Sequence, residues 1–198
     1  MSAPTLPAQA SPALEPAPMP PARSAFLPRI RRGIAAHFAA HRQRGRWSFF
    51  WRTSVESLVA TLAIVLFAHL FVDLGERTAL NRLSAWQLII FGCAGAPLVE
   101  TVLLQTLPVA LMRAWGQRFW IQVVVSAGLF AAPHFGESLG TGLGTGLAGG
   151  FYFAFTYVHW REKSLSHAFW MTAGSHAARN APAVAALLLT KHLTTAPA

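Results

Sequence analysis

Five long stretches of predominantly apolar residues restrict how this chain can fold more than any other feature. A helix needs about 20 residues to cross the hydrocarbon core of a bilayer, which is about 30 Å thick. Runs of about this length lie at roughly 53–73, 86–112, 118–135, 142–160 and 165–190. With 54% hydrophobic and only 12% charged residues, the chain is also more apolar than an ordinary soluble domain. The pattern predicts an all-α, polytopic membrane helical bundle with about five transmembrane helices.

The segment before the first run has a different composition. Residues 1–28 contain eight of the thirteen prolines and many alanines, and they offer too little apolar surface to offset the entropy lost on folding. They lack the basic start, apolar core and cleavage site of a signal peptide. Residues 29–47 place Ile30, Ile34 and Phe38 at helical spacing among arginines. This spacing is typical of a short interfacial helix, and a solvated basic linker is the alternative.

These differences divide the chain into three parts. We expect a disordered, Pro/Ala-rich and basic tail over 1–47 that can include the interfacial helix, a membrane-embedded domain over 48–192 and a short C-terminal tail over 193–198. The single cysteine, Cys93, excludes an internal disulfide and any site built from several thiolates.

The basic residues indicate which surfaces the chain meets. The formal net charge is +9, and eight of the sixteen Lys and Arg residues lie before Thr53, next to an apolar run. This arrangement favours anionic lipid headgroups as partners, with no nucleic acid. Basic residues in the loops alternate between the two sides, so we expect an inner (plasma) membrane protein with several spans and a cytoplasmic N-terminus. The C-terminus is expected outside, or on either side if Pro182 breaks the fifth run.

Four polar residues inside the apolar runs require an explanation. An ionisable group at the middle of a membrane costs about 2.5–3.5 kcal/mol even on the lenient insertion scale. Glu100 is the acidic residue of the second run, His134 closes the third, and His176 and Asn180 lie four residues apart in the fifth. Residues at this spacing share one face of a helix.

These residue types fit peptide hydrolysis. A carboxylate can act as general base on a water molecule that a histidine holds and polarises. An imidazole N–H together with an amide N–H can stabilise the oxyanion of the tetrahedral intermediate. We therefore predict that Glu100, His134, His176 and Asn180 line one cavity and form the catalytic set. For each histidine alone, a packing role inside the bundle remains the alternative.

The same residues resemble a known pattern. The CAAX-protease and bacteriocin-processing family (CPBP, or Abi) of intramembrane glutamic endopeptidases has the motifs EExxxR, FxxxH and HxxxN on successive membrane helices. Here Glu100 to Gln105 (ETVLLQ) stands at the first motif, Phe130 to His134 (FAAPH) at the second, and His176 to Asn180 (HAARN) at the third. The resemblance covers roughly residues 83–190 and implies a CAAX-protease-like core.

The resemblance also assigns roles. It implies that Glu100 acts on the hydrolytic water and that His134, His176 and Asn180 complete the site, with Phe130 in support. Thr101 replaces the second glutamate of the family's motif, and Gln105 replaces its arginine. A Thr–Gln hydrogen bond within the same turn would substitute for that charge pair without burying a charge. The family needs no obligate metal, so we expect no cofactor, with zinc as the chemical alternative because one carboxylate and two histidines suffice for a catalytic site.

Two other functions remain to be weighed. The string from Gly144 to Gly149 fits GxGxxG, but no strand precedes it and no acidic ribose partner follows, so we expect no nucleotide. Gly142, Gly146 and Gly150 instead have the small-xxx-small spacing that lets membrane helices approach closely. The substrate expected for an enzyme is a membrane-associated peptide or protein. The alternative is a catalytically degenerate family member that acts as a membrane scaffold or self-immunity protein, for which Thr101 and Gln105 are the supporting features.

Overall fold

The computed structural model describes residues 26–75 and 82–195, and the backbone divides into two units, Met1–Ala40 and His41–Ala198. In the first unit the described part is helical, as the beginning of α1 (Phe26–Arg42). This helix overlaps the predicted interfacial segment and begins three residues earlier. Of the segment 1–28 for which disorder is expected, residues 1–25 lie outside the described residues, and residues 26–28 belong to α1.

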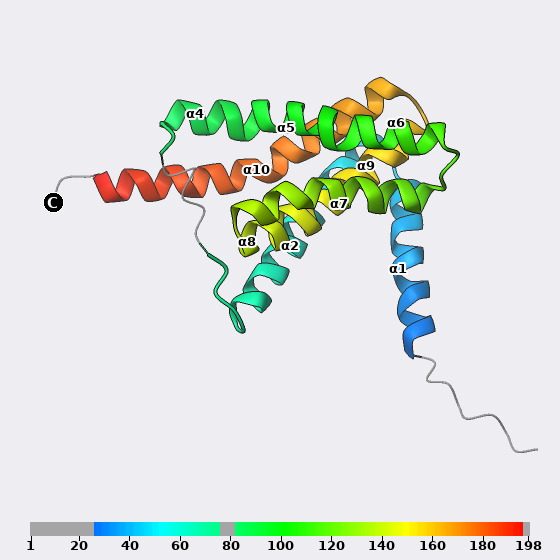
Figure 1. The fold of residues 1–198 in the computed structure, drawn as a ribbon, viewed down its shortest axis with the longest axis horizontal. Coiled ribbons are helices and arrows are strands. Elements are labelled where there is room, and N and C mark those ends of the chain that lie inside the picture. Colours follow the sequence, from blue (N-terminus) through cyan, green and yellow to red (C-terminus); the bar gives the residue numbers. More distant parts are fainter. Residues whose placement is uncertain (1–25, 76–81, 196–198) are drawn as a thin grey trace, which may run out of the picture. The chain divides into compact units, whose positions relative to one another are not determined.

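Every regular element of the described second unit is a helix (Figure 1). In chain order these elements are α2 (Arg46–His69), α4 (Ala85–Ile90), η1 (Phe91–Gly95), α5 (Ala96–Glu100), η2 (Thr101–Thr106), α6 (Leu107–Ala114), α7 (Phe119–Glu137), α8 (Leu139–Thr141), η3 (Gly142–Gly149), α9 (Gly150–Arg161) and α10 (Leu165–Thr195). The η elements are π-helical. The all-α prediction is therefore confirmed for the described residues.

Each of the five predicted runs contains helix. In the described part of the chain, three helices are long and apolar enough to cross a membrane: Arg46–His69, Ala85–Ala114 and Phe119–Glu137. The other two runs correspond to η3 with α9 and to α10. They are less apolar because much of α9 is buried inside the bundle and α10 carries polar residues of the cavity described below. Despite Pro182, α10 is a single helix of 31 residues, so the alternative of a broken fifth run is wrong.

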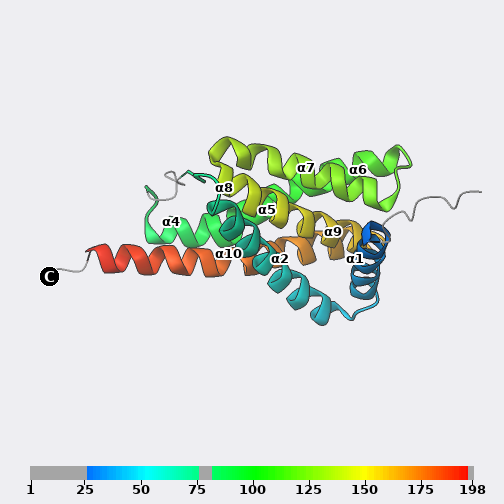
Figure 2. The same cartoon turned by 90° about the horizontal axis from the view of Figure 1, so that it is seen from below.

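The second run forms one continuous helix, Ala85–Ala114, which we call the rod. Its hydrogen bonding changes from α-helical to π-helical at two places. It starts at a capping box, in which the Ser84 hydroxyl accepts from the Gln87 N–H and the Gln87 side chain accepts from the Ser84 N–H. Its π-helical stretches, η1 and η2, end just before Pro97 and Pro108. A proline lacks an N–H and its ring clashes with the carbonyl four residues earlier, so the helix widens in front of it. Figures 1 and 2 show α10 running alongside this rod, which it contacts from α4 to η2.

A tight turn reverses the chain between α6 and α7. Gly116 has a positive φ of 67°, which a glycine adopts without steric cost. The Gln117 N–H donates to the Met112 carbonyl and the Gly116 N–H donates to the Arg113 carbonyl, which together form a Schellman motif. The turn sends α7 back along the rod, where it contacts α6 and η2.

The glycine run packs tightly against α7, as its spacing predicted. A Cβ on Gly146 would lie 3.0 Å from the Cα of Ala131 and 3.2 Å from the Cβ of His134. A Cβ on Gly150 would lie 2.9 Å from the Phe130 ring, and one on Gly142 would lie within 2.6 Å of the Phe135 ring. This close approach places η3 directly behind the FxxxH residues of α7.

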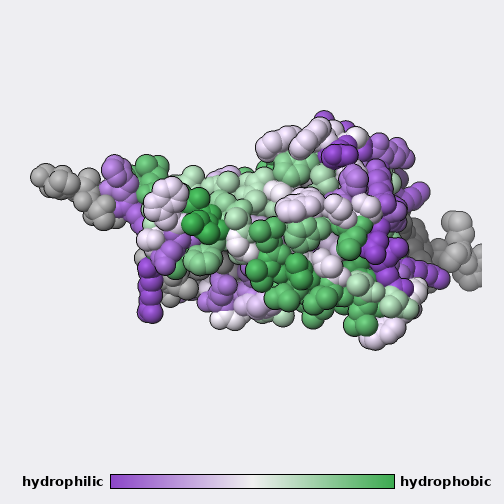
Figure 3. All heavy atoms as spheres, turned by 90° about the horizontal axis from the view of Figure 1, so that it is seen from above, coloured by the Kyte–Doolittle hydropathy of each residue, from purple (hydrophilic) through white to green (hydrophobic). Residues whose placement is uncertain are grey.

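Large apolar side chains cover much of the outer surface. Figure 3 shows hydrophobic side chains gathered over a large part of one face. Examples from the rod alone are Trp86, Ile90, Val99, Leu103 and Leu107, each more than half exposed. Soluble monomers rarely expose such continuous apolar surface, whereas lipid tails solvate it without cost. The buried side chains therefore lie in contacts between helices and around the polar groups of the cavity.

Candidate active site

Glu100 is the last residue of α5, where the rod passes into the π-helical stretch η2. Its side chain is 26% exposed and faces the interior of the bundle. Single turns of π-helix are frequent at functional sites because they redirect side chains within an otherwise regular helix. The only acidic residue of the rod thus lies at a register change on its inner face.

His134 lies near the end of α7 and is buried. Its Nδ1 is 2.8 Å from the Phe130 carbonyl. A carbonyl only accepts hydrogen bonds, so Nδ1 carries the proton, and in the neutral ring Nε2 keeps the lone pair. The ring also stacks on Phe130 with a centroid distance of 4.7 Å. The four-residue spacing of FxxxH therefore fixes both the tautomer and the direction of the imidazole.

His176 lies in the middle of α10 and is 2% exposed. Its ring stacks on Phe153 at 4.2 Å and meets the edge of Phe130 at 5.6 Å. Its Nε2 lies 3.7 Å from Glu100 Oε2. That separation is too long for a hydrogen bond and short enough for a direct electrostatic contact. The aromatic rings therefore hold this imidazole beside the carboxylate.

Asn180 is bonded to a backbone carbonyl that the rod itself leaves without an N–H donor. In η1 the Ala96 N–H bonds back five residues to the Phe91 carbonyl. In the same register the Gly92 carbonyl would accept from residue 97, which is a proline and has no N–H. The Nδ2 of Asn180 donates to that carbonyl at 3.0 Å. Asn180 thus replaces a hydrogen bond that Pro97 removed.

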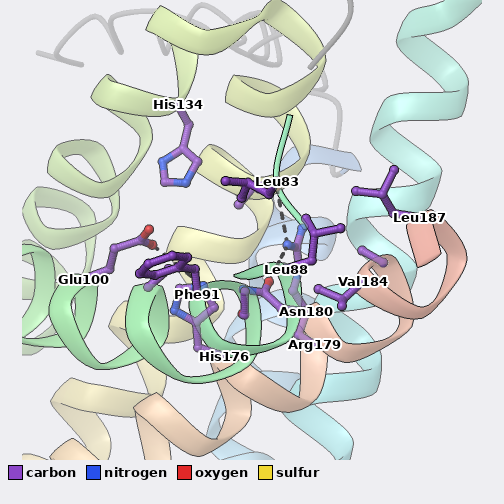
Figure 4. A pocket seen from close by; sticks show the side chains of 14 residues that line it. Leu83, Leu88, Phe91, Glu100, His134, His176, Arg179, Asn180, Val184 and Leu187 are labelled. Carbon is purple, nitrogen blue, oxygen red and sulfur yellow. Dashed lines mark hydrogen bonds and ion pairs between the residues drawn. The ribbon is translucent and has the colours of Figure 1, made fainter. Parts of the chain in front are cut away.

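All four residues line one cavity of about 170 Å³. In Figure 4 Glu100, His134 and His176 point toward a common space from three different helices, and Asn180 lies one turn beyond His176. The rest of the wall is mostly apolar, with Leu83, Leu88, Phe91, Gly92, Ala96, Thr145, Arg179, Ala183, Val184 and Leu187. The structure therefore brings together all four residues that the sequence selected.

Thr101 and Gln105 do not line this cavity. Both are buried at 1% exposure, and neither belongs to the cavity wall. The Ser126 Oγ of α7 lies 2.8 Å from the Leu104 carbonyl and within hydrogen-bond distance of Gln105 Oε1. In α-helical register the Leu104 carbonyl would accept from residue 108, which is a proline and has no N–H, and Ser126 provides a donor from the neighbouring helix.

The predicted hydrogen bond between Thr101 and Gln105 is wrong. Thr101 Oγ1 and Gln105 Nε2 have no hydrogen-bond partner among the described residues. The reason is the π-helical register of η2, in which residues five apart meet across a turn. Accordingly, Thr106 Oγ1 donates to the Thr101 carbonyl at 3.0 Å. At the position of the family's arginine, Gln105 thus contacts α7 through Ser126. At the position of the second glutamate, Thr101 is buried inside the bundle.

Arg179 is a cavity residue that the sequence analysis missed. It is 6% exposed, and its guanidinium donates to Thr61 Oγ1 at 2.9 Å and to Asn180 Oδ1 at 3.3 Å. Inside HxxxN it occupies a spacer position, so the motif gives it no role. The available signal was its charge, since an arginine within an apolar run is as costly as Glu100.

The donor set of the cavity also bears on metal binding. One carboxylate and two imidazoles are the ligand types of a catalytic zinc site. Within the part of the chain that the structure describes, Glu100, His134 and His176 do not form a group whose ligand atoms all lie within 4.8 Å of one another. As placed, they do not form a ready-made metal site.

The fold defines a multi-pass helical membrane protein whose cavity gathers a carboxylate, two imidazoles, a carboxamide and a guanidinium. Comparison with known families matches residues 81–182 to the model for type II CAAX prenyl endopeptidase Rce1-like proteins. The match spans more than half of the chain and includes Glu100, His134, His176 and Asn180. The chain belongs to this family, a family of membrane proteases. No curated protein and no solved structure matched it.

Proposed function

We propose that this chain is an intramembrane endopeptidase that hydrolyses a peptide bond of a membrane-associated peptide or protein, with water activated by Glu100. One observation carries the proposal. Three helices that are separate in sequence direct a carboxylate, two imidazoles and a carboxamide to a single cavity inside an apolar bundle. Each of these polar groups is costly in a membrane unless it is used or partnered.

The proposed reaction begins with a water molecule between Glu100 and His134. The lone pair of His134 Nε2 accepts a hydrogen bond from this water, and the Glu100 carboxylate removes its proton as the oxygen attacks the carbonyl carbon. Glu100 then gives the proton to the leaving nitrogen as the C–N bond breaks, so that one group serves as base and then as acid. General acid–base catalysis of this kind contributes about 10²–10⁴-fold.

Two further groups are suited to the oxyanion that forms during attack. The buried imidazole of His176 offers an N–H, and the Asn180 amide has a second N–H besides the one bonded to Gly92. Donors of this kind are worth roughly 10²–10³-fold each when they are held in place before the reaction. The aromatic contacts of His176 and the backbone bond of Asn180 supply that rigidity.

We further propose that the protein resides in the plasma (inner) membrane with its N-terminus in the cytoplasm. The support is the cluster of arginines before the first span. A protease added to the outer face of intact cells should leave an N-terminal tag uncut, and removal of the tag from outside would reverse this orientation.

The degenerate-scaffold alternative rested on Thr101 and Gln105. Both lie outside the cavity wall, and Gln105 contacts α7 through Ser126 instead. Their replacement therefore removes no group from the proposed reaction. We favour the enzyme for this reason.

Cleavage assays with purified protein test the proposal. Wild type in liposomes should cut members of a panel of membrane-associated peptides, with products identified by mass spectrometry. His134→Ala should lower the rate about 10²-fold or more, whereas His192→Ala, at an exposed position on α10, serves as the matched control and should not. A chelator should leave the rate unchanged. Absence of product across the panel would contradict the proposal and favour the scaffold or self-immunity reading.

A further inference from the structure

Arg179 brings a permanent positive charge to the wall of the cavity. It precedes Asn180 on α10 and, of the described residues that line the cavity, it is the only lysine or arginine. The cavity wall around it is mostly apolar, so a charge there acts in a medium of lower polarity than water. The reaction proposed above makes no use of this group.

Neutral oxygens from three elements hold the guanidinium in place. Its Nη2 donates to Thr61 Oγ1 of α2 at 2.9 Å. Its Nη1 donates to Thr145 Oγ1 of η3 at 3.4 Å and to Asn180 Oδ1 at 3.3 Å. Thr61 Oγ1 in turn donates to the Gly144 carbonyl at 3.0 Å, so its hydroxyl proton is committed and its lone pairs face Arg179. The guanidinium is thus oriented before any ligand arrives.

Gly149 of η3 lies beside this side chain. A Cβ on Gly149 would lie 3.6 Å from Cζ and 3.7 Å from Nε of Arg179, which is ordinary van der Waals contact. The missing side chain of this glycine leaves room beside the guanidinium. An oriented planar guanidinium is the side chain best suited to pair with a carboxylate through two parallel hydrogen bonds.

We propose that Arg179 anchors a carboxylate of the peptide substrate next to the scissile bond. The inference rests on the proposed function, since it concerns what enters the same cavity. Arg179 lies three residues after His176, which places their Cβ atoms about 5–6 Å apart on one helix face. His176 Nε2 is 3.7 Å from Glu100 Oε2. An extended peptide advances about 3.3 Å per residue, so the anchored carboxylate lies only a few residues from the bond that Glu100 reaches.

The carboxylate has two chemical sources, a free C-terminus and an acidic side chain. Both offer the same two oxygens to the guanidinium, and Arg179 alone does not distinguish them. If Arg179 has a purely structural role and only links α2, η3 and α10, peptides with either kind of carboxylate should bind no better than peptides without one.

Binding measured without turnover separates these cases. The full-length Glu100→Gln protein in a non-ionic detergent is titrated into a fluorescein-labelled alternating Ala/Leu pentapeptide with a free C-terminal carboxylate. A second probe is the same peptide as its carboxamide, and a third is the carboxamide with one glutamate. Fluorescence anisotropy gives the three dissociation constants. A charge-assisted contact should make the free acid bind about 10–100-fold more tightly than the carboxamide. Tight binding of the glutamate probe would assign the contact to a side chain as well.

Substitutions then assign the preference to this residue. Arg179→Gln in the same background should bring the ratio of acid to amide affinity close to one. Arg179→Lys, which keeps the charge but not the planar fork, should retain part of the preference. Arg113→Gln removes an exposed cation at the end of α6 and should keep all of it.

The inference would be overturned if the Glu100→Gln protein with Arg179 intact bound the acid and the amide with equal affinity. Binding of none of the three probes would also overturn it. The same would follow if Arg179→Gln lowered the affinity for all three probes by one common factor, as a purely structural role predicts. Because these measurements use the Glu100→Gln protein, they do not depend on catalysis. Failure of the proposed hydrolysis would appear separately, as an absence of cleavage by the wild type.

Discussion

Pro97 and Asn180 are linked through a single backbone carbonyl, that of Gly92. The proline removes the N–H that the π-helical register would direct to this oxygen, and the asparagine amide supplies a replacement from α10. Asn180 of the HxxxN motif thus has a structural role besides the chemical role proposed for it. The two roles are separable, because a residue with an N–H at position 97 would restore the hydrogen bond to the Gly92 carbonyl from within the rod.

We predict that Asn180→Ala loses both roles and that Pro97→Ala restores only one. Asn180→Ala should lower stability by about 1–3 kcal/mol, since a buried carbonyl is left unpaired. It should also slow cleavage by roughly 10²–10³-fold. In the double variant Pro97→Ala/Asn180→Ala, thermal unfolding in detergent should recover most of the stability while cleavage stays slow. Recovery of both would show that Asn180 acts only as a structural partner.

Ser126 makes the corresponding bond at the second proline of the rod. Ser126→Ala should destabilise the protein by about 1–3 kcal/mol, because the Leu104 carbonyl loses its donor in a buried contact. Ser48→Ala, at an exposed position on α2, is the matched control and should stay within about 0.5 kcal/mol of wild type.

Thr101→Ala and Gln105→Ala should only weaken cleavage at matched folding, since neither side chain reaches the cavity. A complete loss of cleavage in a folded Gln105→Ala protein would return this position to the reaction. The measurement is the initial rate per folded molecule, with folding followed by gel filtration.

At the residue level the sequence identified the cavity well, for a physical reason. Ionisable groups in apolar runs are expensive, so Glu100, His134 and His176 stood out without any structure. Arg179 carries the same signal, but it occupies a spacer position of the HxxxN motif, and the motif assigns no role to that position. Its partner Thr61 lies 118 residues away in sequence, and no local pattern relates the two.

At the scale of elements, prolines and glycines determine how the motif residues meet. Pro97 and Pro108 each follow a π-helical stretch, with Glu100 between the two and Gln105 in contact with Ser126 of α7. A proline in an apolar run indicates a distortion of the helix but not its register, because a π-helix is rare and local composition does not specify it. Around Pro133, for example, α7 remains α-helical.

The glycine contact behind His134 gives a prediction at this scale. Gly146→Ala places a methyl group 3.0 Å from the Ala131 backbone and 3.2 Å from the Cβ of His134, so α7 must move by a few tenths of an ångström. Cleavage should fall roughly tenfold, less than the 10²-fold typical of a 1 Å misplacement. Gly128→Ala on α7 meets nothing within 4 Å and should raise helix stability by up to about 1 kcal/mol with cleavage unchanged. Equal rates for both variants would show that η3 does not position His134.

At the scale of the whole molecule, the five apolar runs were predictable, but the number of membrane crossings was not. Length and hydropathy distinguish three of the described helices, while α9 is largely enclosed by its neighbours. A helix that other helices surround needs no apolar exterior, so hydropathy loses its meaning there. The edges of the helices also moved, as for the first run, which begins at Arg46 rather than at residue 53.

The N-terminal tail should be dispensable for folding. Its Pro/Ala composition offers little surface to bury, so deletion of residues 2–25 should leave membrane insertion and cleavage intact. Expression level in the membrane fraction and the cleavage rate of the purified protein measure this. Loss of the folded protein on deletion would mean that the tail packs against the domain.

The central claim, that Glu100 activates the hydrolytic water, is tested most directly by one substitution. Glu100→Gln keeps the volume and hydrogen-bonding capacity of the side chain but cannot take up the proton of water. The measurement is the initial rate of cleavage of a membrane-associated peptide in liposomes, with wild type and variant matched for folding by their thermal unfolding. The account predicts a fall of about 10²–10⁴-fold. Equal rates for the two proteins would contradict it.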